Sequence, residues 1–454
     1  MHNKRSTFSG KLGFVLSAAG ASVGLGNIWR FPYLAAKYGG GIFLLIYIVL
    51  ALTFGYTMII AETTLGRMTK KSPVGAFHTF AKTKFASFSG WINAIIPILI
   101  VPYYSVIGGW VIKYLFEYLK GDAKLLATDT YFPNFISNGV STEICFILFT
   151  FFTLAIIYAG VQNGIERVSK FMMPVLVVLS VIIAGYSISR PGAFEGVKYF
   201  LIPNFDNFSW MTVVSAMGQM FYSLSIAMGI LITFGSYMKK DTSIEKSTEN
   251  VEIFDTAIAI MAGLMIIPAV FAFSGGNAET LKSGPALMFI TIPKVFANMG
   301  FGTAIGVVFF LLVLFAAVTS SIALTESAVS TFEDELHWSR KKSTVFMGMV
   351  MLLLGTLSCL GYGPLANFKI LGMQFLDFFD FITNSVMMPI AAIATCLLVS
   401  KVVGVDKIEE EIKKDGQAFR RKKIFCFMIK YLCPLFAAII LISSVANAFG
   451  IITM

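Results

Sequence analysis

Long apolar runs recur along the whole chain and constrain its fold more than any other feature. A hydrocarbon core about 30 Å thick is crossed by roughly 20 apolar residues of helix. Such runs cover residues 12–37, 41–66, 89–119, 142–160, 168–189, 209–237, 248–274, 300–332, 344–361, 371–400 and 424–450. A lone strand cannot satisfy its backbone in lipid, so each run must be a helix. The sequence therefore predicts an all-α membrane protein with eleven transmembrane helices.

The composition supports this assignment and argues against a nucleic-acid partner. The chain is 57% hydrophobic and 13% charged, whereas soluble domains carry roughly 25% charged residues. Its net charge is +10, but the basic residues lie in short loops between apolar runs. No polar segment is long enough for a separate domain. We expect residues 1–454 to form one transmembrane domain whose main partner, besides a small-molecule solute, is the lipid bilayer.

The basic loops also predict the orientation of the chain. Clusters such as Arg67 to Lys71, Arg340 to Lys342 and Arg420 to Lys423 follow alternate runs, and basic loops stay in the cytoplasm. This places the N-terminus inside and, with eleven runs, the C-terminus outside. The polar N-terminus and the absence of a small-residue cleavage site indicate no signal peptide. We expect a multi-pass protein of the cell (inner) membrane.

The sequence offers no set of residues typical of an enzyme or a transition-metal site. The five cysteines lie in or beside apolar runs and form no CxxC pair, and the three histidines lie near polar loops. We expect buried free thiols, no disulfide and no catalytic residues. The cysteines are Cys145, Cys359, Cys396, Cys426 and Cys433.

The first run interrupts its own helix at its centre. The stretch SAAGASVGLGNIWRFP, residues 17–32, places glycines, an asparagine and an arginine where a membrane span favours leucine. Each half of the run is about ten residues, or about 15 Å of helix, so the break lies near the bilayer midplane. Non-helical backbone at that depth is tolerated where it lines a cavity.

The sixth run repeats this interruption. Ser223, Ser225 and Gly229 lie midway along residues 209–237, five runs later and in the opposite direction. Paired interrupted spans in two inverted halves indicate the binding site of a secondary transporter, where freed carbonyls coordinate Na⁺ and helix N-termini attract a carboxylate. The halves would be about 12–189 and 209–400, with 424–450 as an extra helix. The alternative is that these small residues serve only close helix packing.

Several motifs then identify a family. GASVGLGNIWRFPYLAAKYGGGIFLLIY, AETTLGR, PYYSVIGGW, GQMFYSLSIAMG, FAAVTSSIALTES and FEDEL occur in this order. The chain resembles the neurotransmitter:sodium symporters, close to their bacterial amino-acid-transporting branch of eleven-span type. The resemblance covers essentially the whole chain. It implies a 5+5 inverted-repeat transporter fold with broken first and sixth helices.

The resemblance implies two sodium ions as cofactors. The first would be held by Ser22, Asn27, Ser223 and Asp255 together with the substrate carboxylate. The second would be held by the carbonyls of Gly20, Val23 and Ala316 and the hydroxyls of Thr319 and Ser320. These ligands make chemical sense, because Na⁺ is a hard cation that prefers oxygen.

Asp255 departs from the family pattern, in which asparagine is common at this position and several members pair the site with chloride. A carboxylate inside a span is a functional candidate by default. Because its fixed negative charge would replace the anion, we do not expect a chloride requirement. The alternative is that Asp255 lies at the inner end of its helix and faces water.

Gly24 bears on the substrate. Monoamine-carrying relatives have aspartate at this position, so a chain with glycine should take a ligand that brings its own carboxylate. A zwitterionic amino acid, hydrophobic or aromatic, would meet the backbone of both breaks and an apolar wall. The substrate-binding residues implied are Ala21, Ser22, Gly24, Leu25, Gly26, Ile100, Tyr104, Tyr222, Ser223, Ser225, Met228, Ser320 and Leu324.

The resemblance also implies two gates. Arg30 and Asp380 would form the outer gate, and Arg5 and Asp334 the inner one, with Phe8 where tryptophan is usual. Taken alone, Arg5 is better explained as a cytoplasmic anchor. Glu62 and Gln219 would brace the unwound backbone.

Together these features predict a sodium-coupled symporter that imports a hydrophobic or aromatic L-amino acid by alternating access. A proton-coupled amino-acid carrier of the same fold is the main alternative, although it would not need Asn27, Thr319 and Ser320 together. A channel would need a continuous polar pore, whereas the polar residues here cluster at one depth.

Overall fold

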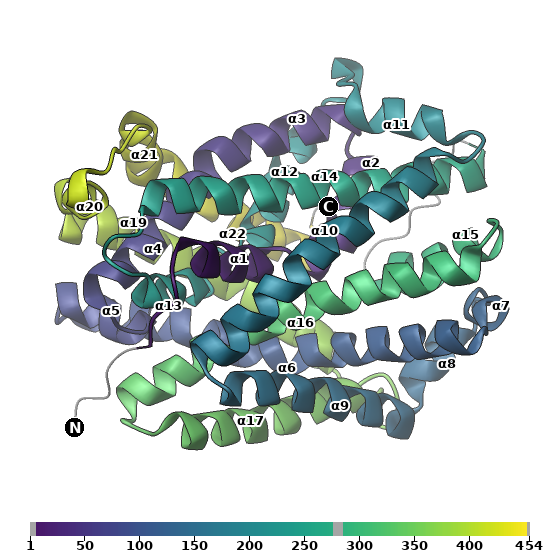
Figure 1. The fold of residues 1–454 in the computed structure, drawn as a ribbon, viewed down its shortest axis with the longest axis horizontal. Coiled ribbons are helices and arrows are strands. Elements are labelled where there is room, and N and C mark those ends of the chain that lie inside the picture. Colours follow the sequence, from purple (N-terminus) through teal and green to yellow (C-terminus); the bar gives the residue numbers. More distant parts are fainter. Residues whose placement is uncertain (1–5, 276–284, 452–454) are drawn as a thin grey trace.

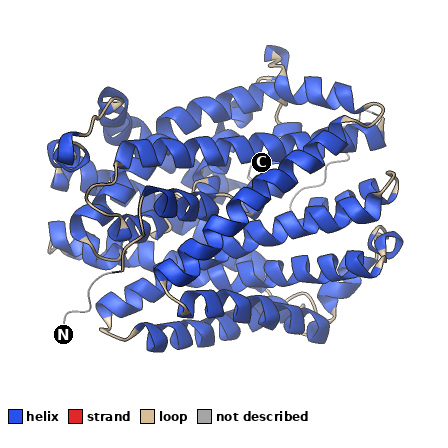
Figure 2. Ribbon diagram, in the orientation of Figure 1, coloured by secondary structure: helices blue, strands red, loops and turns tan. Residues whose placement is uncertain are grey.

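The computed structural model describes residues 6–275 and 285–451, and this part of the chain consists of helices joined by loops, without a β-strand (Figure 2). The helices lie side by side along the long axis of the molecule (Figure 1). Nine of those described are long and apolar enough to cross a membrane: Gly41–Thr69 (α3, η2 and α4), Lys84–Lys120 (α6), Gly139–Tyr158 (α9), Val161–Ile188 (η3 and α10), Ile244–Ser274 (α14), Gly302–Glu335 (α16), Arg340–Leu360 (α17), Phe375–Val403 (α18, η7, α19 and η8) and Lys422–Ala448 (α21, η10 and α22).

The first predicted span is broken as expected. Helix α1, Lys11–Ser22, ends where Val23 turns to an extended conformation with ψ of 91°. The chain becomes helical again in the π-helical turn Gly26–Arg30 (η1) and in α2, Phe31–Lys37. The two halves are bent by 54°, and as one span they bring the candidate crossings in the described residues to ten.

The sixth predicted span is broken more widely. Helix α12, Trp210–Ser223, begins at a capping box formed by Ser209 and Thr212. Helix α13 covers Ile230–Tyr237, and residues 224–229 between them are not α-helical. Neither half alone is long enough to cross a bilayer. This break accounts for the difference between the eleven predicted runs and the ten candidate crossings.

Three residues in this second break have left-handed backbone. Ser225, Ala227 and Gly229 have φ of 53°, 60° and 68°. Glycine adopts this conformation freely, but serine and alanine pay a steric cost for it. Surrounding contacts must therefore hold the segment in place, and they are described with the site.

Short helices connect the long ones. Between α6 and α9 these are α7 (Ala123–Leu126) and α8 (Tyr131–Ser137), and before α12 they are α11 (Ala193–Leu201) and η4 (Phe205–Asn207). The described part of the segment before α16 forms η6 (Leu287–Thr291) and α15 (Ile292–Ala297). At the other end of the molecule lie α5 (Pro73–Phe80), α20 (Val405–Ile412) and η9 (Lys414–Gly416) (Figure 1).

Glycine serves close packing in this fold, both at the breaks and between α4 (Tyr56–Thr69) and α13. A Cβ on Gly66 would lie 1.9 Å from the carbonyl oxygen of Ile232, and one on Gly235 would lie 2.3 Å from that of Thr63. The two backbones therefore touch directly, as small residues allow in membrane helices. This contact positions the inner half of the sixth span.

We predict that Gly66→Ala destabilises the protein, because the added methyl overlaps the backbone of α13. Overpacking of this kind costs about 1–3 kcal/mol or more. Gly185→Ala is the matched control, since none of the described atoms lies within 4 Å of its Cβ position, and it should be neutral or stabilising by up to about 1 kcal/mol. Thermal unfolding of the detergent-solubilised variants measures both. Equal melting temperatures would contradict the direct backbone contact.

Candidate functional site

A small cavity of about 30 Å³ lies between the two helix breaks, α6 and α16. Every residue predicted to contact the substrate lines it, and Asn27 joins them. The backbone of both breaks forms one side of this cavity. Ile100, Tyr104, Ser320 and Leu324 form the facing wall. The structure therefore brings the whole predicted set together at the place where the helices part.

At two glycines of the first break, neighbouring side chains occupy the space that a Cβ atom would need. A Cβ on Gly24 would lie 2.7 Å from Ser320 Oγ and 3.1 Å from the Tyr104 hydroxyl, and one on Gly26 would lie 2.5 Å from the Tyr222 ring. Leu25, between them, donates its backbone N–H to the Tyr104 hydroxyl at 3.3 Å. An aspartate side chain at position 24 would not fit this arrangement.

The size of the cavity limits what enters without rearrangement. A volume of about 30 Å³ holds one or two water molecules. A bulky amino-acid side chain would require its walls to move. Met228 is the most adaptable of them, because methionine is unbranched and repacks at low cost.

Asp255, on α14, is fully buried beside this cavity. Its carboxylate accepts hydrogen bonds from Asn27 Nδ2 at 2.8 Å, the Tyr47 hydroxyl at 3.2 Å and Ser223 Oγ at 3.0 Å. Within the described ranges no lysine, arginine or histidine forms an ion pair with it. The alternative that Asp255 faces water is therefore wrong. A buried carboxylate with neutral donors alone is costly unless a cation or a proton joins it.

The residues named for the first sodium ion surround this carboxylate. Asn27 spans the first break, since its Oδ1 accepts the N–H of Gly24 at 3.2 Å. Ser22 and Ser223 line the cavity beside it. A carboxylate, an amide oxygen, hydroxyls and backbone carbonyls form an oxygen-rich set that fits a hard monovalent cation.

The residues named for the second sodium ion also meet, where α1 crosses α16. Ser320 Oγ lies 3.3 Å from the Gly20 carbonyl and 3.4 Å from that of Val23. Thr319 Oγ1 lies 3.2 Å from the Ala316 carbonyl, and a Cβ on Gly20 would lie 3.1 Å from Thr319 Cβ. This second cluster has only neutral oxygens, so it too fits Na⁺ better than a divalent ion.

Glu62 and Gln219 brace the breaks as predicted. Glu62 Oε1 accepts the N–H of Ala227 at 2.8 Å, and Gln219 Nε2 donates to the Gly26 carbonyl at 3.1 Å. Ser225 Oγ donates to the Ala21 carbonyl at 3.0 Å, which links one break to the other. These bonds satisfy backbone groups that the missing helical turns leave open.

Comparison with known families decides the identity of the chain. The model of the sodium:neurotransmitter symporter family matches residues 5–130 and 134–451. The chain belongs to the sodium:neurotransmitter symporter family. It is a membrane transporter and not an enzyme.

Prokaryotic relatives of this symporter match nearly end to end. The sodium-dependent transporter YhdH of Bacillus subtilis is 33% identical over 98% of both chains. The sodium-dependent transporter MJ1319 of Methanocaldococcus jannaschii is 30% identical over 90% of this chain and 85% of its own. The crystal structure of MhsT in complex with L-phenylalanine aligns with a TM-score of 0.86 and 34% identity, covering 97% of this chain and 100% of that one.

A second, larger cavity of about 480 Å³ adjoins the symporter's first cavity and is lined by both residues predicted for the outer gate. Arg30 and Asp380 do not form an ion pair within the described residues. The Arg30 guanidinium lies 5.3 Å from the centre of the Tyr222 ring instead. Asp380 accepts hydrogen bonds from Tyr103 at 3.2 Å and Asn384 at 2.6 Å. Leu25, Tyr104 and Tyr222 line both cavities and therefore lie between them.

The inner gate can be placed only in part. Arg5 lies outside the described residues, and Asp334 accepts the N–H of Ser72 at 2.6 Å. Phe8 is buried, donates its N–H to the Tyr237 carbonyl at 3.0 Å, and packs edge-on against Phe234 and Tyr237. Phe8, which the resemblance assigns to the inner gate, is thus in contact with α13.

Sequence analysis missed an ion pair near Phe8. Glu326, fully buried on α16, accepts from the Tyr237 hydroxyl at 2.6 Å and from both terminal nitrogens of Arg340 at 3.0 and 2.6 Å. The carboxylate within an apolar run was a usable signal, the same one that marked Asp255. The sequence pattern assigns Arg340 only to the basic residues that orient the chain.

We predict that Glu62→Ala weakens both stability and substrate binding. It leaves the buried N–H of Ala227 without an acceptor, which costs about 1–3 kcal/mol. Glu62→Gln keeps an oxygen at the same place and should lose much less. Melting temperature in detergent and binding of radiolabelled amino acid test the pair. Equal losses in both variants would show that the charge of Glu62, rather than its acceptor oxygen, matters.

Proposed function

We propose that this symporter couples inward Na⁺ flow to the uptake of a hydrophobic or aromatic L-amino acid by alternating access. The observation that carries the proposal is the buried carboxylate of Asp255, which has neutral donors only among the described residues and lies beside the cavity between two helix breaks. A sodium ion there would balance its charge. The amino-acid carboxylate would complete the coordination.

Coupling follows from this shared ion. If the first Na⁺ contacts both Asp255 and the substrate carboxylate, each ligand raises the affinity of the other. A second Na⁺ among Gly20, Val23, Ala316, Thr319 and Ser320 would fasten α1 to α16. Its release would free the inner half of the first span to move.

The chemistry of the cavity supports the substrate class. The Leu25 region offers backbone N–H groups and the Tyr104 hydroxyl to a carboxylate, and the Ala21 and Ser225 backbone offers carbonyls to an amine. Ile100, Tyr104, Met228 and Leu324 make the remaining wall apolar and aromatic. L-phenylalanine, which is bound in the MhsT crystal structure, belongs to this class.

The proposal includes the full architecture. Helices α12 and α13 would together form the sixth of eleven spans, and residues 12–189 and 209–400 would form inverted halves, with a last helix at 424–450. The N-terminus would lie in the cytoplasm and the C-terminus outside, in the cell (inner) membrane. Arg30 with Asp380, and Arg5 with Asp334, would pair and separate as the outer and inner gates.

A proton-coupled carrier remains the second candidate, for one specific reason. A proton on Asp255 would also relieve its buried charge. Glu62 adds a further carboxylate, whose Oε2 has no hydrogen-bond partner among the described residues. The neutral oxygen cluster around Thr319 favours sodium instead, because hydroxyls and carbonyls do not titrate near neutral pH.

We expect uptake of labelled leucine, phenylalanine or tryptophan into proteoliposomes to require an inward Na⁺ gradient. Replacing Na⁺ by K⁺ should abolish accumulation, and a proton gradient in its place should not restore it. Thr319→Ala with Ser320→Ala should raise the half-saturating Na⁺ concentration by about tenfold or more, as loss of direct ligands does. Accumulation in sodium-free medium driven by protons would overturn the proposal in favour of the second candidate.

We expect wild-type uptake to be the same in chloride and in gluconate, because the charge of Asp255 takes the place of an anion. Asp255→Asn removes that charge with little change in shape, so Na⁺ affinity should fall. The measurement is the half-saturating Na⁺ concentration with and without chloride. A wild-type requirement for chloride, or unchanged Na⁺ affinity in the variant, would contradict this role.

A further inference from the structure

A groove of about 510 Å³ lies outside the transport site, between the end of α9 and the start of α17. Its lining includes Tyr158, Trp338, Lys341, Lys342, Val345 and Met349. Arg340 ties the two helices together here, since its Nε donates to the Ile157 carbonyl at 2.9 Å. The same arginine binds Glu326 and, through it, Tyr237 and Phe8. The groove therefore opens at the end of the molecule that holds the described N-terminal residues.

The rim of this groove carries two exposed lysines. Lys341 Nζ lies 5.6 Å from the centre of the Tyr158 ring, and Lys342 Nζ lies 4.0 Å from that of Trp338. Among the described residues no carboxylate lines the groove, and over the same ranges neither lysine is in an ion pair. The nearby carboxylates of Glu326 and Glu333 face Arg340, at 2.6 and 3.8 Å. The two positive charges are thus held in place without an anionic partner from the described part of the chain.

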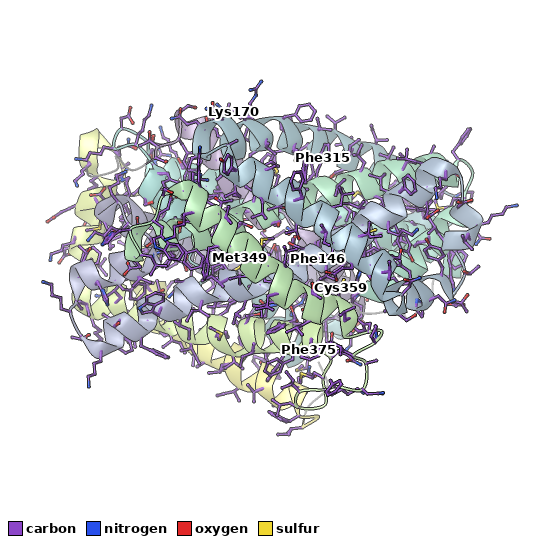
Figure 3. The ribbon with its side chains drawn as sticks, turned by 90° about the horizontal axis from the view of Figure 1, so that it is seen from below. Phe146, Lys170, Phe315, Met349, Cys359 and Phe375 are labelled. Atoms are coloured by element: carbon purple, nitrogen blue, oxygen red, sulfur yellow. The ribbon has the colours of Figure 1, made fainter. Side chains whose placement is uncertain are left out.

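Below the lysines the groove continues into an apolar surface. Val345, Met349 and Leu353 follow one another at four-residue spacing on α17 and are 60%, 56% and 68% exposed. On α9, Tyr158 and Phe151 are 50% and 71% exposed. Figure 3 shows α17 across the near face of the molecule, with Met349 labelled along it. In a membrane span, an exposed face of this kind contacts lipid tails.

We propose that this groove binds an anionic phospholipid. The phosphate would lie between Lys341 and Lys342, the glycerol region against the rings of Trp338 and Tyr158, and one acyl chain along Val345, Met349 and Leu353. Charge complementarity favours this occupant, because basic side chains beside a span attract anionic headgroups and aromatic rings favour the interface. The site is independent of the proposed transport cycle and would stand if the coupling ion were different.

Native mass spectrometry of the full-length, delipidated protein titrated with phosphatidylglycerol tests the site. Each lysine near an anionic headgroup contributes about fivefold to affinity, so Lys341→Gln with Lys342→Gln should weaken the tightest-bound lipid roughly thirtyfold. Lys82→Gln with Lys84→Gln is the matched control. It removes the same charge from exposed lysines just before and at the start of α6, and it should change affinity less than twofold. Thermal unfolding confirms that each variant is folded.

Two further arms separate lipid from other occupants. Val345→Trp keeps both lysines but fills the apolar floor, and it should weaken phosphatidylglycerol at least tenfold. Phosphatidylcholine should bind more weakly than phosphatidylglycerol, and glycerol phosphate should not displace the lipid. The proposal is overturned if the double lysine variant keeps wild-type affinity, if the control pair loses as much, or if glycerol phosphate competes. A dimer peak in place of bound lipid would instead assign the groove to a second copy of the chain.

Discussion

The structure depends on backbone polar groups that two helix breaks release inside the bundle and that nearby groups satisfy. Residues 23–25 and 224–229 leave N–H and C=O groups without helical partners among membrane-spanning helices, where few water molecules can replace those partners. Glu62 and Tyr104 each accept one of these N–H groups. Gln219 and Ser225 donate to the Gly26 and Ala21 carbonyls, which flank the first break. The groups that remain face the cavity, and this arrangement gives an otherwise apolar bundle a polar binding surface.

Three buried carboxylates show how the environment assigns different tasks to one chemical group. Glu62 receives a backbone N–H and holds the second break. The charge of Glu326 is balanced by the guanidinium of Arg340 on α17. Glu326 also accepts from Tyr237, so it links α16 to both α13 and α17 near Phe8. Asp255 receives only neutral donors from the described residues. Glu62 also receives a neutral donor, but Asp255 is the one of the three that contacts Asn27 and Ser223 of the cavity, which is why the proposed coupling rests on it.

Much of the fold could be predicted from the sequence because hydropathy in a membrane protein is a strong signal. The predicted run 248–274 corresponds to a helix over 244–274, and the break at Gly24 appears where glycine and asparagine weaken the first span. The residues around the cavity could be named because a family resemblance assigns positions that spacing alone does not. The location of that cavity could be predicted from the sequence, because both breaks lie midway along their apolar runs.

Other features depend on side-chain partners that are distant in sequence. Arg340 and Glu326 lie on either side of a loop, and the local sequence does not show that their side chains form an ion pair across it. Tyr47 reaches Asp255 from a different span. The separation of Arg30 from Asp380 depends on the rotamers of both side chains and on the position of Tyr222. The short helices between the spans were also missed, since four- to nine-residue helices give no hydropathy signal.

The contact of α4 with α13 has a mechanical consequence. With Gly66 against Ile232 and Gly235 against Thr63, these two backbones leave no space for sliding, so the second span and the inner half of the sixth must travel as one rigid body. The start of the first span is tied to this unit by the backbone bond between Phe8 and Tyr237, and to the neighbouring span by the bond from Ser9 to Glu166. A movement of the first span against α13 must therefore break the bond between Phe8 and Tyr237.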